Sequence, residues 1–302
     1  MPFDSLGLAP ALVQAAAESG YAAPTAIQAA AIPAILQGRD VRGSAQTGSG
    51  KTAAFSLPLL QRLAAERATS PRRVRALVLV PTRELAAQVG ETMRSLAQHL
   101  PERLKIAIAF GGVSINPQMM SLRGGADIVV ATPGRLLDLV DHNALKLNAV
   151  SMLVLDEADR LFDLGFAEEL GRILALLPAQ RQNLLFSATF PPAIQALADS
   201  ALRDPAGIDV QGEPGTEPAI VQRVIEVDAN RRTQLLRHLL KENEWDRVLV
   251  FVATQHAAQT VAEKLYKNGV YAVPFHGDIA QGTRTGILAQ FKESRWDVVI
   301  AT

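Results

Sequence analysis

The sequence predicts an α/β protein built from two parallel-sheet domains in tandem, of which the second is incomplete. Short, continuous apolar runs alternate with amphipathic stretches, one proline- and glycine-rich segment interrupts this alternation, and the alternation then restarts. Continuous apolar runs separated by helices are typical of parallel strands that are buried on both faces of a sheet. The length of 302 residues leaves room for one large domain or two ordinary ones.

Five apolar runs predict the strands of the first domain. They are Ala76–Val80, Ile106–Phe110, Ile128–Ala131, Met152–Leu155 and Leu184–Phe186. Amphipathic stretches such as Glu84–Leu100 and Glu168–Leu177 predict helices between them, because their apolar residues recur at helical spacing. We expect this first domain to extend to residue 207.

The next segment predicts a linker over residues 208–219. Its centre, Gln211–Pro218, holds two prolines, two glycines and no large apolar residue. Beyond it, the runs that predict strands of a second domain are Val221–Val227, Val248–Val252, Val270–Val273 and Val298–Ala301. Residues 220–302 number only about 80, fewer than the roughly 100–200 of an ordinary domain. We therefore expect a fragment whose second sheet is cut off, with an exposed apolar strand edge that lowers stability.

Composition narrows the function classes. Lys+Arg and Asp+Glu number 30 each, so any nucleic-acid contact must come from locally placed groups rather than bulk charge. The absence of cysteine excludes disulfides, thiolate metal sites and cysteine catalysis. The N-terminus lacks the pattern of a signal peptide, and no apolar run approaches the roughly 20 residues that span a bilayer. A cytoplasmic protein is expected.

A glycine-rich segment predicts a phosphate-binding loop. Its residues are Ala45, Gln46, Thr47, Gly48, Ser49, Gly50, Lys51 and Thr52. The glycines let backbone N–H groups surround phosphates at the start of a helix, Lys51 would reach the β- and γ-phosphates, and the Thr52 hydroxyl would bind Mg²⁺. Ala45 stands where the strict pattern has glycine, and a glycine-rich turn without function is the alternative for this segment alone.

An acidic segment, Asp156–Asp159, directly follows a predicted buried strand. Asp156 is expected to share the metal with Thr52, and Glu157 is expected to act as general base toward the attacking water. Acidic residues that only stabilise a helix N-terminus are the alternative. The phosphate loop upstream favours the catalytic interpretation, because each motif supplies what the other lacks.

Polar motifs follow all five predicted strands of the first domain. In open parallel sheets, ligands bind outside the carboxyl ends of the strands, so these motifs are expected along one edge. In chain order they are Pro81–Glu84, Gly111–Gly112, Thr132–Arg135, Asp156–Asp159 and Ser187–Thr189.

Taken in order along the chain, these motifs resemble the motif series of the DEAD-box RNA helicases. The segments that carry the resemblance are Gln28, Ala45–Thr52, Pro81–Ala86, Thr132–Arg135, Asp156–Asp159 and Ser187–Thr189, and it covers essentially the whole chain. His276-Gly277 followed by Gln281–Thr285 is most similar to the bacterial RhlE-type branch.

The resemblance implies the fold and the ligands. It implies two RecA-like domains of the phosphate-loop NTPase type, with ATP and Mg²⁺ as cofactors. The partner is RNA, held through its backbone without sequence preference, and unwinding is local and coupled to ATP hydrolysis. Ribosome-assembly or RNA-decay proteins are candidate partners. The implied division is an adenine-recognising segment over 1–30, an ATP-binding domain over 31–207, and a partial C-terminal domain over 220–302.

The resemblance also assigns residues around the nucleotide. Phe3, Tyr21, Pro24, Thr25 and Gln28 match the adenine-recognising motif, with core packing as the alternative for Phe3. Lys51, Asp156, Glu157, Ser187 and Thr189 form the implied catalytic set. The hydroxyls of Ser187 and Thr189 are expected to bond Asp159 and to couple hydrolysis to strand separation.

A further set matches positions that hold RNA in the family. In the first domain it is Pro81, Thr82, Arg83, Gly111, Gly112, Thr132, Pro133, Gly134 and Arg135, and in the second it is Gln281 and Arg284. Phe251 and His276–Asp278 resemble further RNA-facing elements. Arginine pairs with phosphate in a fork, and glycine allows close approach, but a solvated arginine or a tight turn is the alternative.

The motif series of this sequence departs from that of the family near the C-terminus. Val298–Thr302 matches only the start of the next motif, and the later arginine-rich motif is absent. In related phosphate-loop enzymes an arginine finger is worth about 10³–10⁵ in turnover. The sequence therefore predicts ATP–Mg²⁺ binding with poor hydrolysis, and a catalytically impaired ATP- and RNA-binding module is the alternative function. Another phosphate-loop ATPase, such as a DNA helicase or a transporter motor, is a weaker alternative.

Overall fold

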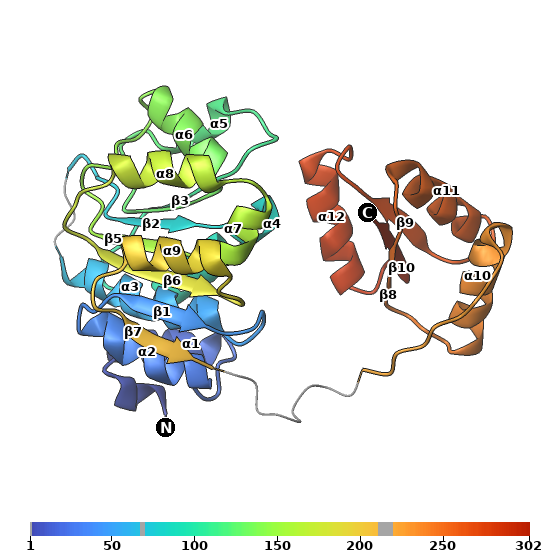
Figure 1. The fold of residues 1–302 in the computed structure, drawn as a ribbon, viewed down its shortest axis with the longest axis horizontal. Coiled ribbons are helices and arrows are strands. Elements are labelled where there is room, and N and C mark those ends of the chain that lie inside the picture. The colour runs from blue at the N-terminus through green and yellow to red at the C-terminus, as the bar shows by residue number, and fades with distance from the viewer. Residues whose placement is uncertain (1, 67–69, 211–219) are drawn as a thin grey trace. The chain divides into compact units, whose positions relative to one another are not determined.

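A computed structural model describes residues 2–66, 70–210 and 220–302 and divides the chain into two units, unit 1 (Met1–Pro218) and unit 2 (Ala219–Thr302) (Figure 1). Each unit is an α/β structure around one parallel sheet. In the described part of the chain, the helices are too short or too polar to span a membrane.

Unit 1 contains a seven-stranded sheet with the order β3-β4-β2-β5-β6-β1-β7, and each neighbouring pair is parallel. The strands are β1 (Val41–Ser44), β2 (Ala76–Leu79), β3 (Ile106–Ala109), β4 (Ile128–Ala131), β5 (Met152–Leu155), β6 (Gln182–Ser187) and β7 (Ala206–Asp209). The helices are η1 (Phe3–Leu6), α1 (Pro10–Glu18), α2 (Ala26–Leu36), α3 (Lys51–Ala65), α4 (Arg83–Ala97), α5 (Asn116–Ser121), α6 (Pro133–Asp141), α7 (Ala158–Asp163), α8 (Ala167–Leu176) and α9 (Pro192–Ala201).

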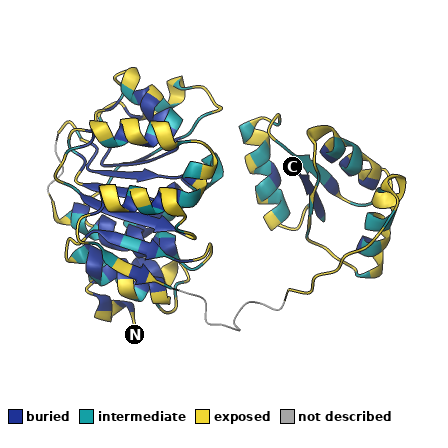
Figure 2. Ribbon diagram, viewed as in Figure 1, coloured by how far each residue is buried: buried dark blue, intermediate teal, exposed yellow. Residues whose placement is uncertain are grey.

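Two hydrophobic clusters cover the two faces of this sheet. Val78 and other alternate strand residues pack with η1 and α1 to α4, whereas Leu77, Leu79 and their equivalents pack with α6 to α9. Figure 2 shows the strands buried between helices whose outer surfaces are exposed. Because successive side chains of a strand point to opposite faces, burial on both faces requires the unbroken apolar runs seen in the sequence.

Unit 2 holds a three-stranded parallel sheet in the order β8-β10-β9. Its elements are η2 (Ala229–Arg231), α10 (Arg232–Glu242), β8 (Val248–Phe251), α11 (Gln255–Tyr266), β9 (Ala272–Phe275), α12 (Gln281–Lys292) and β10 (Val298–Ala301). The predicted exposed apolar strand edge is found at β8, and its effect on stability stays a prediction. β10 is the central strand, paired on both sides and buried, and the apolar residues exposed in this sheet are Leu249 and Phe251 of β8.

The structure also differs from the sequence prediction around the linker and in two strands of unit 1. The predicted strand Val221–Val227 has no regular structure, and Val224 is fully exposed, because this stretch pairs with no neighbouring strand. Ile208, assigned to the linker, belongs to β7, which pairs with β1. The rest of that predicted linker from Gln211 to Ala219 lies outside the described residues. Strands β1 and β7 escape apolar pattern recognition because their sequences are Val-Arg-Gly-Ser and Ala-Gly-Ile-Asp.

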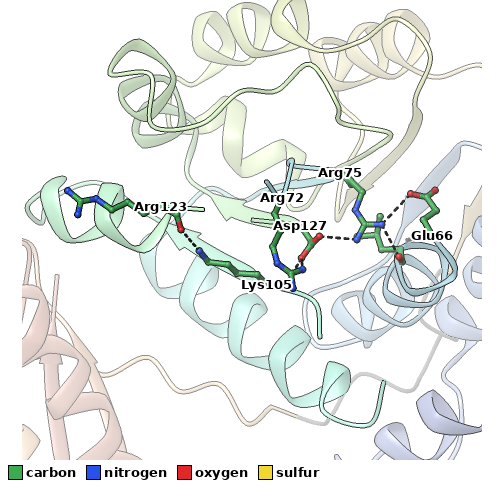
Figure 3. Close-up of polar contacts among 7 residues, drawn as sticks. Glu66, Arg72, Arg75, Lys105, Arg123 and Asp127 are labelled. Atoms are coloured by element: carbon green, nitrogen blue, oxygen red, sulfur yellow. Dashed lines mark hydrogen bonds and ion pairs between the residues drawn. The ribbon is translucent and has the colours of Figure 1, made fainter. Parts of the chain in front are cut away.

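A buried carboxylate ties together the amino ends of three strands (Figure 3). Asp127, which precedes β4 and is 1% exposed, accepts hydrogen bonds from Arg75 Nη2 at 3.0 Å and from Lys105 N at 2.8 Å. It also forms an ion pair with Arg72. Arg75 precedes β2, Lys105 precedes β3, and Arg75 also pairs with Glu66 at 3.4 Å beyond the end of α3. Charged hydrogen bonds and ion pairs therefore join the amino ends of β2, β3 and β4.

Candidate nucleotide and nucleic-acid site

The order of the strands in unit 1 divides the sequence motifs into two groups along the carboxyl edge of the sheet. All strands of unit 1 are parallel, so the segments that follow them meet at the carboxyl ends. The adjacent strands β1, β6 and β5 lead into the phosphate loop, Ser187–Thr189 and Asp156–Asp159. The adjacent strands β2, β4 and β3 lead into the segments that resemble RNA-holding motifs. The topology therefore gathers the predicted nucleotide residues in one half and the predicted RNA residues in the other.

The phosphate loop joins β1 to α3 and points backbone groups toward the helix start. Lys51 opens α3, and its Nζ donates a hydrogen bond to the carbonyl oxygen of Ala45 at 2.8 Å. The Ser49 hydroxyl is buried and has no hydrogen-bond partner among the described residues. Because the first N–H groups of a helix are unpaired and lie at its positive end, this arrangement suits a phosphate. Ala45 is 2% exposed within the core and uses only its backbone here, so its departure from glycine leaves the loop intact.

Gln28 connects the N-terminal segment to this loop. The side chain is 1% exposed. Its Oε1 accepts a hydrogen bond from Thr25 N at 3.0 Å, and its Nε2 donates one to the Gly50 carbonyl at 3.1 Å. Gly50 has a φ of 93°, and a Cβ there would lie 2.4 Å from Gln28 Nε2, so this position requires glycine. One N–H and one lone pair of the Gln28 amide are left for a nucleotide base.

The other predicted adenine-contact residues differ in their surroundings. Phe3 is 5% exposed and belongs to the hydrophobic core, which is the alternative that the sequence left open. Tyr21 is half-buried against the same core, and its burial raises the pKa of the phenol. Thr25 precedes α2, where its backbone N–H is bonded by Gln28.

Two neighbouring carboxylates follow β5. Asp156 is 2% exposed, and its Oδ1 accepts a hydrogen bond from Glu157 N at 3.0 Å. Burial raises the pKa of Asp156 to about 6, and the nearby charge of Lys51 limits this rise. Glu157 has φ 51° and ψ 52°, a left-handed conformation that costs a residue with a Cβ roughly 1–2 kcal/mol. Backbone strain of this kind gathers at functional sites, and here it marks the turn from β5 into α7.

Asp159 is held by the segment after β6, as the sequence predicts for the two hydroxyls. Thr189 donates from N and from Oγ1 to Asp159 Oδ2, both at 2.9 Å. The Ser187 Oγ accepts a hydrogen bond from Asp159 N at 3.1 Å. Burial alone would raise the pKa of the Asp159 carboxyl, but the hydrogen bonds donated by Thr189 and by Arg160 N outweigh burial, so the pKa lies below its usual value. The carboxylate therefore stays ionised and joins the two motifs.

Asp156→Asn is expected to stabilise the protein at neutral pH. The folded-state pKa of about 6 lies above the usual 3.8, so the folded state binds more protons between these values and stability falls as the pH rises through that window. About two pKa units correspond to at most about 3 kcal/mol. Urea denaturation without nucleotide or metal should show a gain of about 1–3 kcal/mol at pH 7 that disappears near pH 4. An equal gain at both pH values would contradict the ionisation argument, and the exposed Asp163→Asn serves as the control.

In the other half of the edge, Arg83 lies against the segment that follows β3. A Cβ at Gly112 would lie 1.9 Å from Arg83 Nη1, so the guanidinium packs directly on this glycine. Thr82 precedes α4, and its Oγ1 accepts a hydrogen bond from Leu85 N at 3.2 Å. Pro81 and Thr82 thus form the turn into α4, and Thr132, Pro133 and Gly134 form the turn into α6.

Arg135 is not the solvated side chain that the sequence left as an alternative. It is 7% exposed, its Nη2 donates to the Val113 carbonyl at 2.8 Å, and its Nε lies 3.4 Å from Asp138 Oδ2. Gln118, which the sequence analysis missed, holds the same loop, because its amide bonds both the N–H of Phe110 at 3.2 Å and the carbonyl of Phe110 at 3.0 Å. No motif marks Gln118, so only the tertiary contact identifies it.

In unit 2, the predicted residues cluster at the start of α12. Arg284 Nη1 donates to Gln281 Oε1 at 3.4 Å, and its guanidinium lies 4.9 Å from the ring centroid of Phe275. His276 Nδ1 is buried without a hydrogen-bond partner among the described residues. Phe251, at the end of β8, is 74% exposed. Asp278 accepts a hydrogen bond from Gln255 at 3.3 Å, which fixes the loop between β9 and α12.

Two family models match this chain. The model described as DEAD/DEAH box helicase matches residues 25–197, and the one described as helicase conserved C-terminal domain matches residues 231–302. The first match covers the phosphate loop, the acidic segment and Ser187–Thr189, and the second covers most of unit 2.

Curated relatives and solved structures agree with these matches. The ATP-dependent RNA helicase DeaD of Escherichia coli is 42% identical over 99% of this chain and 47% of its own length. The DEAD-box ATP-dependent RNA helicase CshA of Bacillus cereus is 39% identical over 99% of this chain and 56% of its own length. The chain thus spans about half the length of the curated relatives it matches.

Among solved structures, S. cerevisiae Dbp5 bound to RNA and ADP BeF3 is 29% identical and covers 99% of this chain and 75% of its own, with a TM-score of 0.81. A DEAD box protein from Methanococcus jannaschii is 36% identical and covers 100% of this chain and 80% of its own, with a TM-score of 0.65. These relatives carry names other than RhlE, so that branch stays a prediction.

Proposed function

The chain belongs to the DEAD/DEAH box helicase family, and from this premise we propose that its activity is ATP-dependent local unwinding of RNA. The observation that carries the proposal is the junction of three motifs at one sheet edge. The phosphate loop, the Asp156–Glu157 pair and the Asp159–Thr189 link follow the adjacent strands β1, β5 and β6. The RNA helicase relatives, which match almost the whole of this chain, support it.

The residues of the loop suit a nucleotide triphosphate with Mg²⁺. Thr52 and Asp156 would hold the metal, which neutralises phosphate charge when bound. Asp156 fits this role because its buried carboxylate, with a pKa raised by burial, gains from a neighbouring cation. Among the described residues no cluster of three or more His, Cys, Asp or Glu could hold a metal alone, so phosphate and water oxygens would complete the shell. Lys51 would exchange the Ala45 carbonyl for a phosphate oxygen.

Glu157 is the proposed general base. Its side chain is 13% exposed, and its strained backbone places it at the first residue after Asp156. A carboxylate there can accept a proton from the water that attacks the terminal phosphate. Asp159 would transmit the change on phosphate release, because its carboxylate accepts two hydrogen bonds from Thr189 and its backbone N–H donates one to Ser187 Oγ.

RNA is proposed to bind the other half of the edge through its backbone. Arg83 supplies charge there and packs on Gly112, while the open space beside Gly111 allows a strand to approach closely. Arg135 acts indirectly, because it is buried and holds the carbonyl of Val113 in the same loop. Gln281 and Arg284 would add contacts from unit 2. Contacts of this kind position a strand without reading its bases. The cytoplasmic location and the protein partners stay predictions.

The test is hydrolysis of ATP with and without RNA. We expect phosphate release to rise when single-stranded RNA is added, and ATP to bind in preference to GTP because an amide at Gln28 can read the edge of adenine. Release that responds to DNA and not to RNA would instead favour another phosphate-loop ATPase. Equal binding of ATP and GTP would contradict the role of Gln28 and leave the family unchanged.

A further inference from the structure

A basic hollow lies on the edge of unit 1 opposite to the nucleotide and RNA residues. It is lined by residues 71–74, 122–126 and 143–148, which precede strands β2, β4 and β5, and its volume is about 520 Å³. These strands are four residues long, so the hollow lies at least about 13 Å from their carboxyl ends at roughly 3.3 Å per residue. It is therefore a feature separate from the site described above.

The charge of this hollow is positive only. Arg72, Arg73, Arg123 and Lys146 line it, and among the described residues no carboxylate does. The nearest carboxylate, Asp127, is 1% exposed and is already bonded by Arg72 and Arg75. Within residues 2–66, 70–210 and 220–302, the charged groups of Arg73, Arg123 and Lys146 have no hydrogen-bond or ion-pair partner. In a chain with a net charge of zero, this is a local surplus of positive charge.

The backbone around the hollow is fixed. Gly125 has a φ of 82°, and a Cβ there would lie 2.0 Å from the Arg72 carbonyl oxygen, so two lining segments touch backbone to backbone. Lys105 Nζ donates to the Arg123 carbonyl at 2.9 Å. Figure 3 shows Arg72 pointing toward Asp127, whereas the guanidinium of Arg123 points away from it. The backbone that carries the positive side chains is therefore preorganised, which reduces the conformational entropy lost when a ligand binds.

The lining favours phosphate over an amphipathic acidic peptide. Its apolar members are closed off, since Val74, Leu122 and Leu145 are 3%, 4% and 8% exposed. In the part of the chain that the structure describes, no aromatic residue lines the hollow, so a base has no ring there on which to stack. What remains accessible is arginine, lysine and the amides of Asn143 and Asn148, and these groups suit phosphate and sugar oxygens.

We propose that this hollow is a second, sequence-neutral contact for the phosphate backbone of RNA that extends beyond the first site. The inference rests on the proposed function, because the RNA reaches unit 1 through the residues at the carboxyl edge. This contact increases the affinity for long RNA and the salt dependence of its binding, and it leaves ATP hydrolysis unchanged.

The test compares Arg123→Glu/Lys146→Glu with a matched reversal, Arg39→Glu/Arg172→Glu, at exposed positions outside both sites. Binding of single-stranded RNA of about 10 and about 40 nucleotides is measured across a salt series, the shorter within the roughly 4–16 nucleotides that one site holds. For long RNA, the first variant should bind about tenfold more weakly at low salt, and its salt slope should fall by about 1.4 for two lost contacts. Short RNA should bind both variants and the wild type alike.

Each other outcome has a definite meaning. Long RNA that binds both variants as it binds the wild type would overturn the inference and leave the proposed function standing. If the wild type binds neither the short nor the long RNA, the proposed function itself is contradicted. Binding of pyrophosphate or of a polyglutamate peptide that depends on Arg123 and Lys146, with RNA unaffected, would also overturn it. If the glutamate variant melts early, Arg123→Gln/Lys146→Gln gives the same measurement.

Discussion

Glu157→Gln is expected to reduce RNA-stimulated phosphate release by about 10²–10⁴-fold, the usual contribution of a general base. Glutamine keeps the size and the hydrogen-bonding shape of the side chain but cannot take up the proton of the attacking water. The proposed phosphate loop does not include this carboxylate, because Lys51, Ser49 and Gly50 belong to the segment after β1. ATP binding, measured by fluorescence of a labelled nucleotide, should therefore be unchanged.

The matched control is Glu168→Gln in the first turn of α8, where the side chain is exposed and follows no site strand. Its rate should equal that of the wild type. A Glu157→Gln variant that keeps most of the wild-type rate would show that the base lies elsewhere. Equal losses in both variants would indicate a general effect of charge rather than proton transfer.

Asp127→Ala is expected to lower the free energy of unfolding of unit 1 by about 3 kcal/mol or more. Removal of one partner of a buried ion pair leaves the other uncompensated, which typically costs about 3–5 kcal/mol. The Arg75 side chain is 8% exposed and would keep the Leu63 carbonyl at 2.9 Å and, as its one charged partner among the described residues, Glu66 at 3.4 Å and 56% exposed. Arg72 is 29% exposed and can turn to solvent, which places the effect at the lower end. For a unit of this size the melting temperature should fall by about 6–12 °C.

The chain offers an internal reference for this measurement. Both tryptophans, Trp245 and Trp296, lie in unit 2, so their fluorescence follows unit 2 while far-UV circular dichroism follows both units. The variant should shift the dichroism transition of unit 1 and leave the fluorescence transition in place. The control Asp141→Asn removes an exposed pair with Arg172 at 3.7 Å and should cost less than about 1 kcal/mol. Equal losses for both aspartates would contradict the role of burial.

The sequence alone predicted the candidate chemical segments, which stay predictions, and determined most of the strands that precede them. Unbroken apolar runs predicted β2 to β6 because parallel strands covered on both faces need apolar residues at every position. The phosphate loop and the acidic segment could be read directly, since their chemistry requires particular residue types in immediate succession. The hydroxyls expected to bond Asp159 do so, because Ser187 ends β6, the strand next to β5, and Thr189 follows it two residues later.

Only the tertiary structure decided how these segments meet. Strands β1 and β7 carry glycine and charge, so no apolar pattern marks them, and their places follow from pairing with β6 and with each other. The last apolar run lies at the centre of its sheet and β8 at an edge, since strand order depends on contacts between distant segments. Arg135 matched an RNA motif but is buried, and Gln118 matched nothing yet holds the neighbouring loop. Local sequence specifies what a residue can do, whereas its partners depend on packing across the sheet, which the order of residues does not display.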